Sequence, residues 1–126
     1  MREILFRGKR KDNDEWVEGN YGEYYNGEKK VSCISIPSKE TISVSLCYDV
    51  IPETVGQYTG MTDKNGTKIF EGDILKGLYA NGNAEVEMIN GSWVGYAGKG
   101  WTDIGYVVDR VELIGNVHDN PELLQD

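Results

Sequence analysis

The sequence predicts a mainly β protein, and three observations support this. Apolar and polar residues alternate in TISVSLCY, where Ile42, Val44, Leu46 and Tyr48 share one face, which is typical of a half-buried strand. Asn-Gly, the strongest short hairpin signal, occurs at residues 26–27, 65–66, 81–82 and 90–91. Sixteen singly spread glycines against three prolines indicate many tight turns.

Two hairpins are expected before residue 50. The strand-like runs EILFRGK and EWVEGNYGEYY flank the polar turn residues Asp12-Asn13-Asp14. The runs VSCISI (31–36) and TISVSLCY (41–48) are separated by the turn-like segment 37–40. In the second hairpin we expect Ile42, Val44 and Leu46 to be buried.

The residues after 50 predict a series of short strands and little helix. Period-two runs and turn residues place strands near 55–58, 69–70, 74–79, 84–89, 92–96 and 111–114, which is the pattern of a small barrel. The tail DNPELLQD predicts one helical turn, with Asn120 as cap and Pro121 as its first residue. We therefore expect a β-hairpin subdomain at 1–50, and a barrel subdomain with a C-terminal turn at 51–126.

The stretch QYTGMTDKNGTKIFEGDIL, residues 57–75, admits a chemical and an architectural interpretation. A calcium loop with its invariant glycine at Gly66 would begin at Met61 and end at Gly72, and neither residue has a side-chain oxygen. The alternative is a hairpin turn in which the Asp63 carboxylate accepts from the backbone beside it. We favour the turn.

Glu71-Gly72-Asp73 has the composition of a paired-carboxylate site, and the same two interpretations apply. Acid–base chemistry needs carboxylates held in a cleft, whereas these precede a strand. Gly72 is expected to supply a bulge or a positive φ, and Asp73 to cap the backbone at the strand entry. Similar Gly-Asp entries begin strands in SH3-like barrels. Asn65, Gly66, Gly72 and Asp73 are therefore interpreted as a structural motif.

The run VGQYTGMTDKNGTKIFEGDIL resembles the signature of the YopX family of bacteriophage and prophage proteins. ILFRGKRKDNDEWVEG (4–19) and ELIGNVHDNPELL (112–124) are similar to the two ends of that family. The resemblance implies a mainly β protein in which a β-rich or α+β N-terminal subdomain precedes an SH3-like barrel. It implies no established activity and no catalytic residues.

Charge bears on the class of partner. The net charge is −8, with eight basic and nine acidic residues in 1–50 and five and twelve in 51–126, so the second part repels phosphates. Arg7, Lys9, Arg10 and Lys11 form the one basic run. It is either a solvated hairpin edge or a local nucleic-acid contact diluted by the acidic residues after it. No apolar run is long enough for a membrane helix or a secretory signal, so we expect the cytoplasm of a bacterial host cell.

Aromatic residues crowd the second part. In a small barrel, tyrosines and tryptophans pack in the core or across strands, but on an SH3-like barrel they also form peptide grooves. Both roles stay open. The binding candidates are Trp93, Tyr96, Trp101 and Tyr106.

The chemical inventory points away from catalysis. His118 is the one histidine, so it cannot build a multi-histidine metal site. Cys33 and Cys47 lack metal-ligand spacing and are expected to be reduced, with a disulfide as the alternative. No phosphate loop or dinucleotide motif is present. We expect no cofactor, no enzyme activity and a binding or assembly module that contacts itself or a phage or host protein; a nucleic-acid accessory protein is the alternative.

Overall fold

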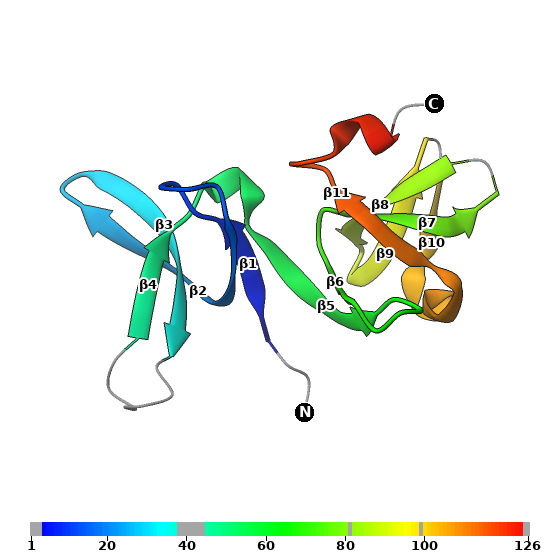
Figure 1. Ribbon diagram of the computed structural model, residues 1–126, viewed down its shortest axis with the longest axis horizontal. Helices are drawn as coiled ribbons and strands as arrows, with labels where there is room; N and C mark the ends of the chain where they lie inside the picture. The colour runs from blue at the N-terminus through cyan, green and yellow to red at the C-terminus, as the bar shows by residue number, and fades with distance from the viewer. Residues whose placement is uncertain (1–3, 38–44, 81, 99, 125–126) are drawn as a thin grey trace. The chain divides into compact units, whose positions relative to one another are not determined.

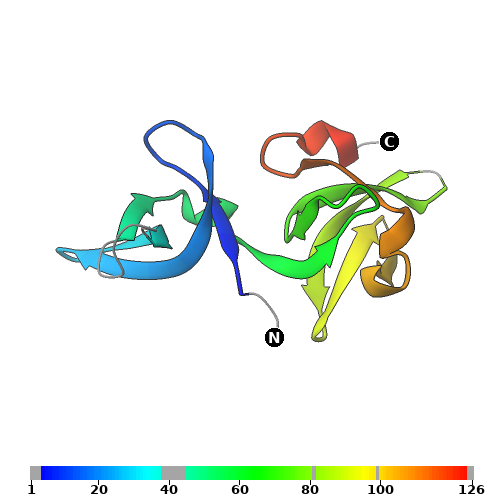
Figure 2. The ribbon, with the colours of Figure 1, turned by 60° about the horizontal axis from the view of Figure 1, so that its bottom comes forward.

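The chain is mainly β, as the sequence predicted, and its strands form two antiparallel sheets (Figure 1). The computed structural model describes residues 4–37, 45–80, 82–98 and 100–124. The chain divides into two compact units, 1–57 and 58–126, where the sequence placed a boundary after residue 50. The strand β5 (Gly56–Thr62) runs from the first unit into the second (Figure 2).

Unit 1 is built from successive antiparallel strands. They are β1 (Phe6–Lys9), β2 (Trp16–Asn26), β3 (Lys29–Pro37) and β4 (Ser45–Asp49). The order is β4-β3-β2-β1-β5, so both predicted hairpins are present. In the β2–β3 turn Asn26 pairs with Lys29, and Gly27 takes a φ of +70°. The turn there is therefore one residue later than Asn-Gly itself.

A short 3-10 helix, η1 (Pro52–Thr54), follows β4 and closes unit 1. The buried Thr54 Oγ1 accepts a hydrogen bond from Lys9 N at 2.9 Å and donates to Ile51 O at 2.6 Å. Ile51 N in turn donates to Lys9 O at 2.8 Å. These contacts attach the chain after β4 to β1, 45 residues away in sequence.

The expected burial of Leu46 is wrong, because its side chain is 55% exposed. Ile42 and Val44 lie outside the described residues. Leu46 lies on β4, the edge strand of this unit's sheet, and pairs with the half-buried Ile36 of β3. Val50, on the same face as Leu46, is fully buried. Alternation selected the face correctly, but distance from the centre of the sheet decided which residues on it are covered.

Unit 2 contains the rest of β5 and six further strands. They are β6 (Lys68–Phe70), β7 (Asp73–Tyr79), β8 (Gly82–Ile89), β9 (Ser92–Ala97), β10 (Gly100–Asp103) and β11 (Glu112–Asn116). Five of them form a sheet in the order β10-β9-β8-β7-β11. All six predicted ranges overlap strands; β10 was missed. Closure into an SH3-like barrel stays a prediction.

Three 3-10 helices connect and end these strands: η2 (Ile104–Tyr106), η3 (Val108–Arg110) and η4 (Pro121–Leu124). The last confirms the predicted C-terminal turn, with Pro121 as its first residue. Asn120 occupies the N-cap position, because its backbone carbonyl accepts from Leu123 N, the first hydrogen bond of the turn. Its side chain bonds outside the turn: Oδ1 accepts from Asn116 N at 3.3 Å.

The core of unit 2 comes from strands and 3-10 helices together. Its buried residues are Ile69, Leu75, Val86, Ile104, Val107 and Val111. The β8–β9 hairpin over it turns through Asn90 (φ +51°) and Gly91 (φ +82°) between the paired Ile89 and Ser92. Positive φ at both central residues is the type I′ geometry that matches strand twist, so this Asn-Gly turn forms as predicted.

Candidate functional site

The four aromatic binding candidates all lie in unit 2, but they differ in exposure. Trp101 on β10 is 51% exposed and Tyr96 on β9 is 39% exposed. Tyr106 in η2 is largely exposed, while Trp93 is half-buried and packs against the core. Trp93 is thus mainly a core residue, and the other three reach the surface.

Strand pairing brings Tyr96 and Trp101 together. Tyr96 pairs directly with Trp101 on one side and with Glu85 of β8 on the other. Directly opposite residues project from the same face of a sheet with Cβ atoms about 4.5–5.5 Å apart. Glu85, Tyr96 and Trp101 therefore form one row across three strands, and Glu87 lies beside it on the same face of β8. We call these four residues the aromatic–acidic surface.

The electrostatics of this surface favour a cation. Burial raises the pKa of Glu85, and the nearby carboxylates Glu87 and Glu71 raise it further. A positive charge placed there would relieve that repulsion. The faces of tyrosine and tryptophan rings also attract cations. Both the carboxylates and the rings would therefore interact favourably with a positively charged group.

Hydrogen bonds hold the strands that carry the aromatic pair. The Tyr79 hydroxyl donates to Gly95 O on β9 at 3.1 Å and lies 3.0 Å from Thr102 Oγ1 on β10. Tyr79 thereby joins β7 to both strands. A rigid support lowers the entropy lost when a surface binds a partner. The sequence pattern did not predict this structural role of Tyr79.

The turn that carries Asn65 and Gly66 is organised by the buried carboxylate of Asp63. Its Oδ1 accepts from Asn65 N and Thr67 N, each at 2.9 Å, and Gly66 takes a φ of +84°. These contacts confirm the predicted backbone bonding of Asp63. Its Oδ2 also accepts from Leu113 N on β11 at 2.9 Å, a contact that the sequence did not indicate.

Gly72 and Asp73 also take part in the backbone structure of unit 2. Gly72 has the positive φ that the sequence predicted, +90°, and its N–H donates to Val86 O at 2.9 Å. The fully buried Asp73 accepts from Phe70 N through Oδ2 at 2.7 Å. These contacts close the turn between β6 and β7.

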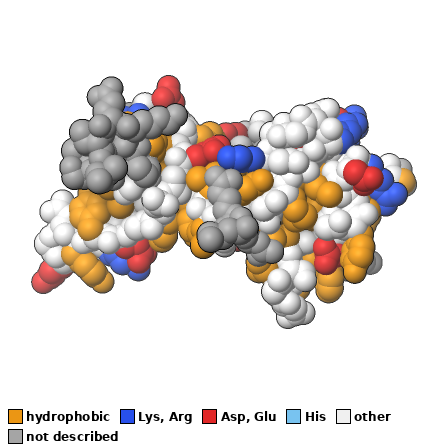
Figure 3. Space-filling view, turned by 90° about the horizontal axis from the view of Figure 1, so that it is seen from below, with side chains coloured by type: hydrophobic (Ala, Val, Ile, Leu, Met, Phe, Trp, Pro, Cys, Tyr) orange, Lys and Arg blue, Asp and Glu red, His pale blue; other side chains and the backbone are white. Residues whose placement is uncertain are grey.

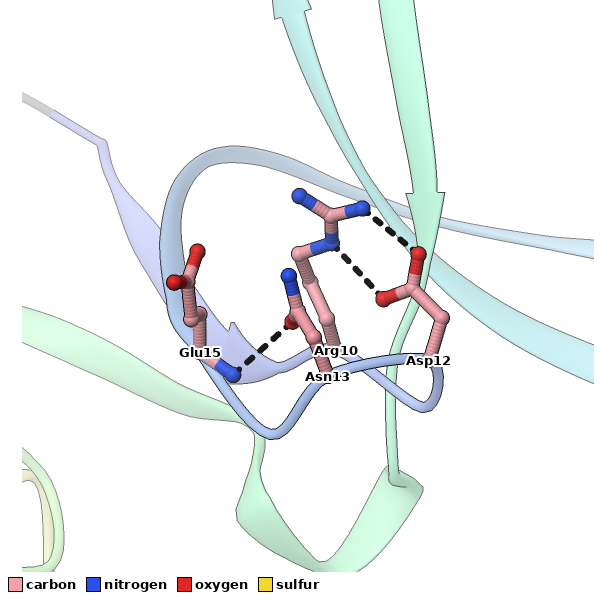
Figure 4. Close-up of polar contacts among 4 residues, drawn as sticks. All are labelled: Arg10, Asp12, Asn13 and Glu15. Atoms are coloured by element: carbon pink, nitrogen blue, oxygen red, sulfur yellow. Dashed lines mark hydrogen bonds and ion pairs between the residues drawn. The ribbon is translucent and has the colours of Figure 1, made fainter.

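Unit 1 contains a recess of about 350 Å³ beside β4. Its lining residues come from the β1–β2 turn and from β4: Arg10, Lys11, Asp12, Cys47, Tyr48 and Asp49. Figure 4 shows the Arg10 guanidinium bound at two points by the Asp12 carboxylate, with N···O distances of 2.9 and 2.6 Å. The Arg10 guanidinium also stacks on the Tyr48 ring, 4.2 Å from its centroid.

The basic run near this recess interacts with its own surroundings. Arg7 and Lys9 lie over the Trp16 ring, 4.6 and 5.9 Å from its centroid. The hydrogen bond from Arg10 is the main cause that lowers the pKa of Asp12. These contacts match a solvated hairpin edge better than an array of cations presented to phosphates.

Among the described residues, no group of three histidine, cysteine or acidic side chains is arranged to hold a metal ion. His118, in the turn after β11, is exposed. Both cysteines carry free thiols, Cys33 buried and Cys47 exposed. The described residues contain no helix that is long and apolar enough to cross a membrane.

The space-filling view (Figure 3) shows hydrophobic side chains, tyrosine included, reaching the surface in several places on one face, with acidic side chains near some of them. Among the described residues of unit 2, the exposed Tyr96 and Trp101 beside Glu85 and Glu87 are the candidate binding surface.

Comparison with known proteins identifies the family but no activity. No curated protein matches the sequence. The fold is similar to the crystal structure of protein EF1440 from Enterococcus faecalis, with a TM-score of 0.59 and 24% identity over 99% of this chain and 100% of that one. The family model of the YopX protein matches residues 5–125. The chain therefore belongs to the YopX protein family.

Proposed function

We propose that this chain is a non-catalytic binding or assembly module, that it acts through protein–protein contacts, and that a protein partner docks on the aromatic–acidic surface. The observation that carries the proposal is the exposed Tyr96–Trp101 pair on β9 and β10, with Glu85 in the same row. The setting we propose is a bacterial cytoplasm, with the chain encoded by a phage or prophage.

The aromatic pair supports a docking role because large exposed rings are costly in water and valuable in an interface. Tryptophan and tyrosine are enriched among the residues that dominate binding energy. Here two such residues lie directly opposite each other on paired strands that the Tyr79 hydrogen bonds hold. A partner that covers them gains apolar burial without first ordering a flexible loop.

Charge narrows the chemistry of the partner. Glu85 and Glu87 adjoin the rings, and the chain carries a net charge of −8. A segment with lysine or arginine would neutralise the carboxylates and place its cation against a ring. We propose a partner segment of this kind, from a phage or host protein or from a second copy of the chain.

The first experiment places a photo-crosslinking amino acid at position 101 in the full chain, with position 25 as the matched control. Tyr25 is an exposed aromatic on β2 of unit 1. The proposal expects a discrete protein adduct from position 101 and not from position 25. Equal adducts from both positions would contradict it.

The second experiment measures the affinity of the purified partner for variants. Trp101→Ala should weaken binding at least about tenfold, the loss expected for an interface anchor. Tyr25→Ala should leave affinity unchanged. The double change Glu85→Gln with Glu87→Gln should reduce the salt dependence of binding. A partner bound equally by wild type and Trp101→Ala would refute the proposed surface.

Light scattering after size exclusion and a gel shift on DNA test self-association and the competing class of partner. Symmetric homo-oligomers are the commonest soluble assemblies, and we expect a dimer or larger assembly that leaves DNA unshifted. A strict monomer that shifts DNA, with affinity falling steeply as salt rises, would favour a nucleic-acid accessory protein instead.

A further inference from the structure

β10 ends the five-stranded sheet of unit 2, so one of its sides meets β9 and the other meets no further strand among the described residues. The end strand of a sheet presents unpaired backbone N–H and C=O groups, which form a template for pairing with another extended segment. β10 also carries Trp101 of the aromatic–acidic surface. The open side of β10 therefore adjoins the surface on which we propose that a partner docks.

The hydrogen-bond phase shows which backbone groups of β10 face that open side. The two-residue turn between β8 and β9 makes Ile89–Ser92 a hydrogen-bonded pair. Because bonded and non-bonded pairs alternate along antiparallel strands, Tyr96 directs its N–H and C=O to β8 and away from β10. Its pair with Trp101 is therefore a non-bonded one, and Trp101 directs its own N–H and C=O to the open side. Asp103, two residues later, has the same phase.

The same pairings arrange the side chains of this face in two rows across the strands. The first row contains Glu85, Tyr96 and Trp101, and the second contains Glu87, Val94 and Asp103. Each row begins at a glutamate on β8 and ends on β10. A strand added at β10 would extend each row by one residue, because directly opposite residues project from the same face of a sheet.

Charge indicates what the two added side chains should be. The rows contain three carboxylates, whereas β8, β9 and β10 contain no lysine or arginine. A cation opposite Trp101 would lie beside an aromatic ring, and a cation opposite Asp103 would lie beside a carboxylate. That carboxylate is held in place, because its Oδ1 accepts from Gly105 N at 2.9 Å.

We propose that the partner docks on the aromatic–acidic surface as an extended basic segment that pairs with β10, antiparallel like the other strand pairs of the sheet. This inference rests on the proposed function and specifies its binding mode and class of partner. One residue of the segment exchanges two backbone hydrogen bonds with Trp101 and places a lysine or arginine against its ring. The residue two positions earlier pairs with Asp103 in the same way and places a second cation at its carboxylate. Main-chain bonds supply affinity, and the alternate side chains supply specificity.

A second copy of the chain fits this edge less well than a different protein does. Each copy carries a net charge of −8, and the pairing of two β10 strands would bring two acidic surfaces together. A basic extended segment has the complementary charge. We therefore assign the edge of β10 to a different protein.

Peptide display on the full chain tests the class of partner. A phage library of random peptides of about ten residues, selected against the purified protein, should yield sequences with lysine or arginine at alternate positions. Trp101→Ala should weaken the best peptide at least about tenfold, and Tyr25→Ala in unit 1 should leave its affinity unchanged. Asp103→Asn keeps an oxygen for Gly105 N but removes the charge, so it should weaken binding severalfold and reduce its salt dependence.

Methylation of single backbone nitrogens of the selected peptide tests the binding mode. In an added strand, alternate N–H groups donate to β10 and the others point away from it. N-methylation at the two basic residues should therefore weaken binding about tenfold each, the equivalent of one hydrogen bond, while methylation of the residue between them should have little effect. This measurement uses the wild-type protein, so it does not depend on the folding of any variant.

The inference would be overturned by equal sensitivity to methylation at all three positions, by unchanged affinity in Trp101→Ala, or by a library that yields no binder. A dimer of the chain that Trp101→Ala dissociates would also overturn it, because a second copy would then occupy the surface. These failures differ from a failure of the proposed function. A protein crosslinked at position 101 that binds without such a segment would refute the added strand alone, whereas the absence of any adduct specific to position 101 would refute both.

Discussion

Asp63 is the residue whose replacement should most clearly destabilise unit 2. Its buried carboxylate accepts hydrogen bonds from Asn65 N, Thr67 N and Leu113 N, each at 2.9 Å. In Asp63→Ala, water can reach the N–H groups of Asn65 and Thr67 because that turn is exposed, so each missing hydrogen bond lowers the free energy of unfolding by about 0.5–1.5 kcal/mol. The Leu113 N–H is less accessible to water, so its missing hydrogen bond costs about 1–3 kcal/mol. The total expected loss of stability is about 2–6 kcal/mol.

Urea unfolding followed by tryptophan fluorescence measures this loss. A Trp16→Phe background leaves the signal to Trp93 and Trp101, both in unit 2. Asp109→Ala, which removes an exposed carboxylate from the same unit, is the matched control and should change stability by no more than about 0.5 kcal/mol. If Asp63→Ala unfolds at the same urea concentration as this control, the structural role assigned to Asp63 is wrong.

The pH dependence of Asp63 gives an independent check. Burial opposes its charge, but the N–H groups of Leu113, Thr67 and Asn65 outweigh that effect and hold its pKa below the ordinary value. A folded-state pKa below the unfolded value stabilises the fold above the unfolded pKa, about 3.9 for aspartate. Wild type should therefore exceed Asp63→Asn in stability near neutral pH, and the gap should close as pH falls below that value. A gap that widens on acidification would contradict this.

Three other predictions concern backbone geometry and metals. Gly91→Ala should destabilise the fold by about 1–2 kcal/mol because the φ of Gly91 is +82°. Gly100→Ala is the control, since Gly100 also has open space for a Cβ but lacks the positive φ. Equal denaturation midpoints for the two variants would contradict the turn assignment. Gly77→Ala combines a φ of +100° with a new Cβ 2.7 Å from Arg110 O, so the free energy of unfolding should fall by about 2–4 kcal/mol. A denaturation midpoint equal to that of wild type would contradict this close approach. EDTA should leave the melting temperature unchanged; a drop of several degrees that one cation restores would reveal a metal site.

Local chemistry explains why much of the strand pattern was predictable. Asn90-Gly91 turns where the sequence places it because few residues tolerate positive φ at two successive positions. Gly72 adopts its expected positive φ, and Asp63 accepts from its own turn, for similarly local reasons. Such features depend on a few consecutive residues, so no knowledge of the rest of the chain was needed.

The misses have a common cause in long-range pairing. Leu46 alternates like a buried residue, yet it is exposed because it lies near one end of the sheet of unit 1. β10 was missed because Gly100–Asp103 is too short to show a period of two, and its pairing with β9 defines it as a strand. Alternation assigns residues to faces, while coverage depends on neighbours far away in sequence.

The sequence by itself determined the β class, most of the turns, the family resemblance and the aromatic residues worth testing. Only the tertiary structure decided which residues meet: Tyr96 with Trp101 and Glu85, and Asp63 with Leu113 fifty residues away. The physical reason is that strand register is set by the sum of many pairings across a sheet. A shift of one residue would move each of these side chains to the opposite face.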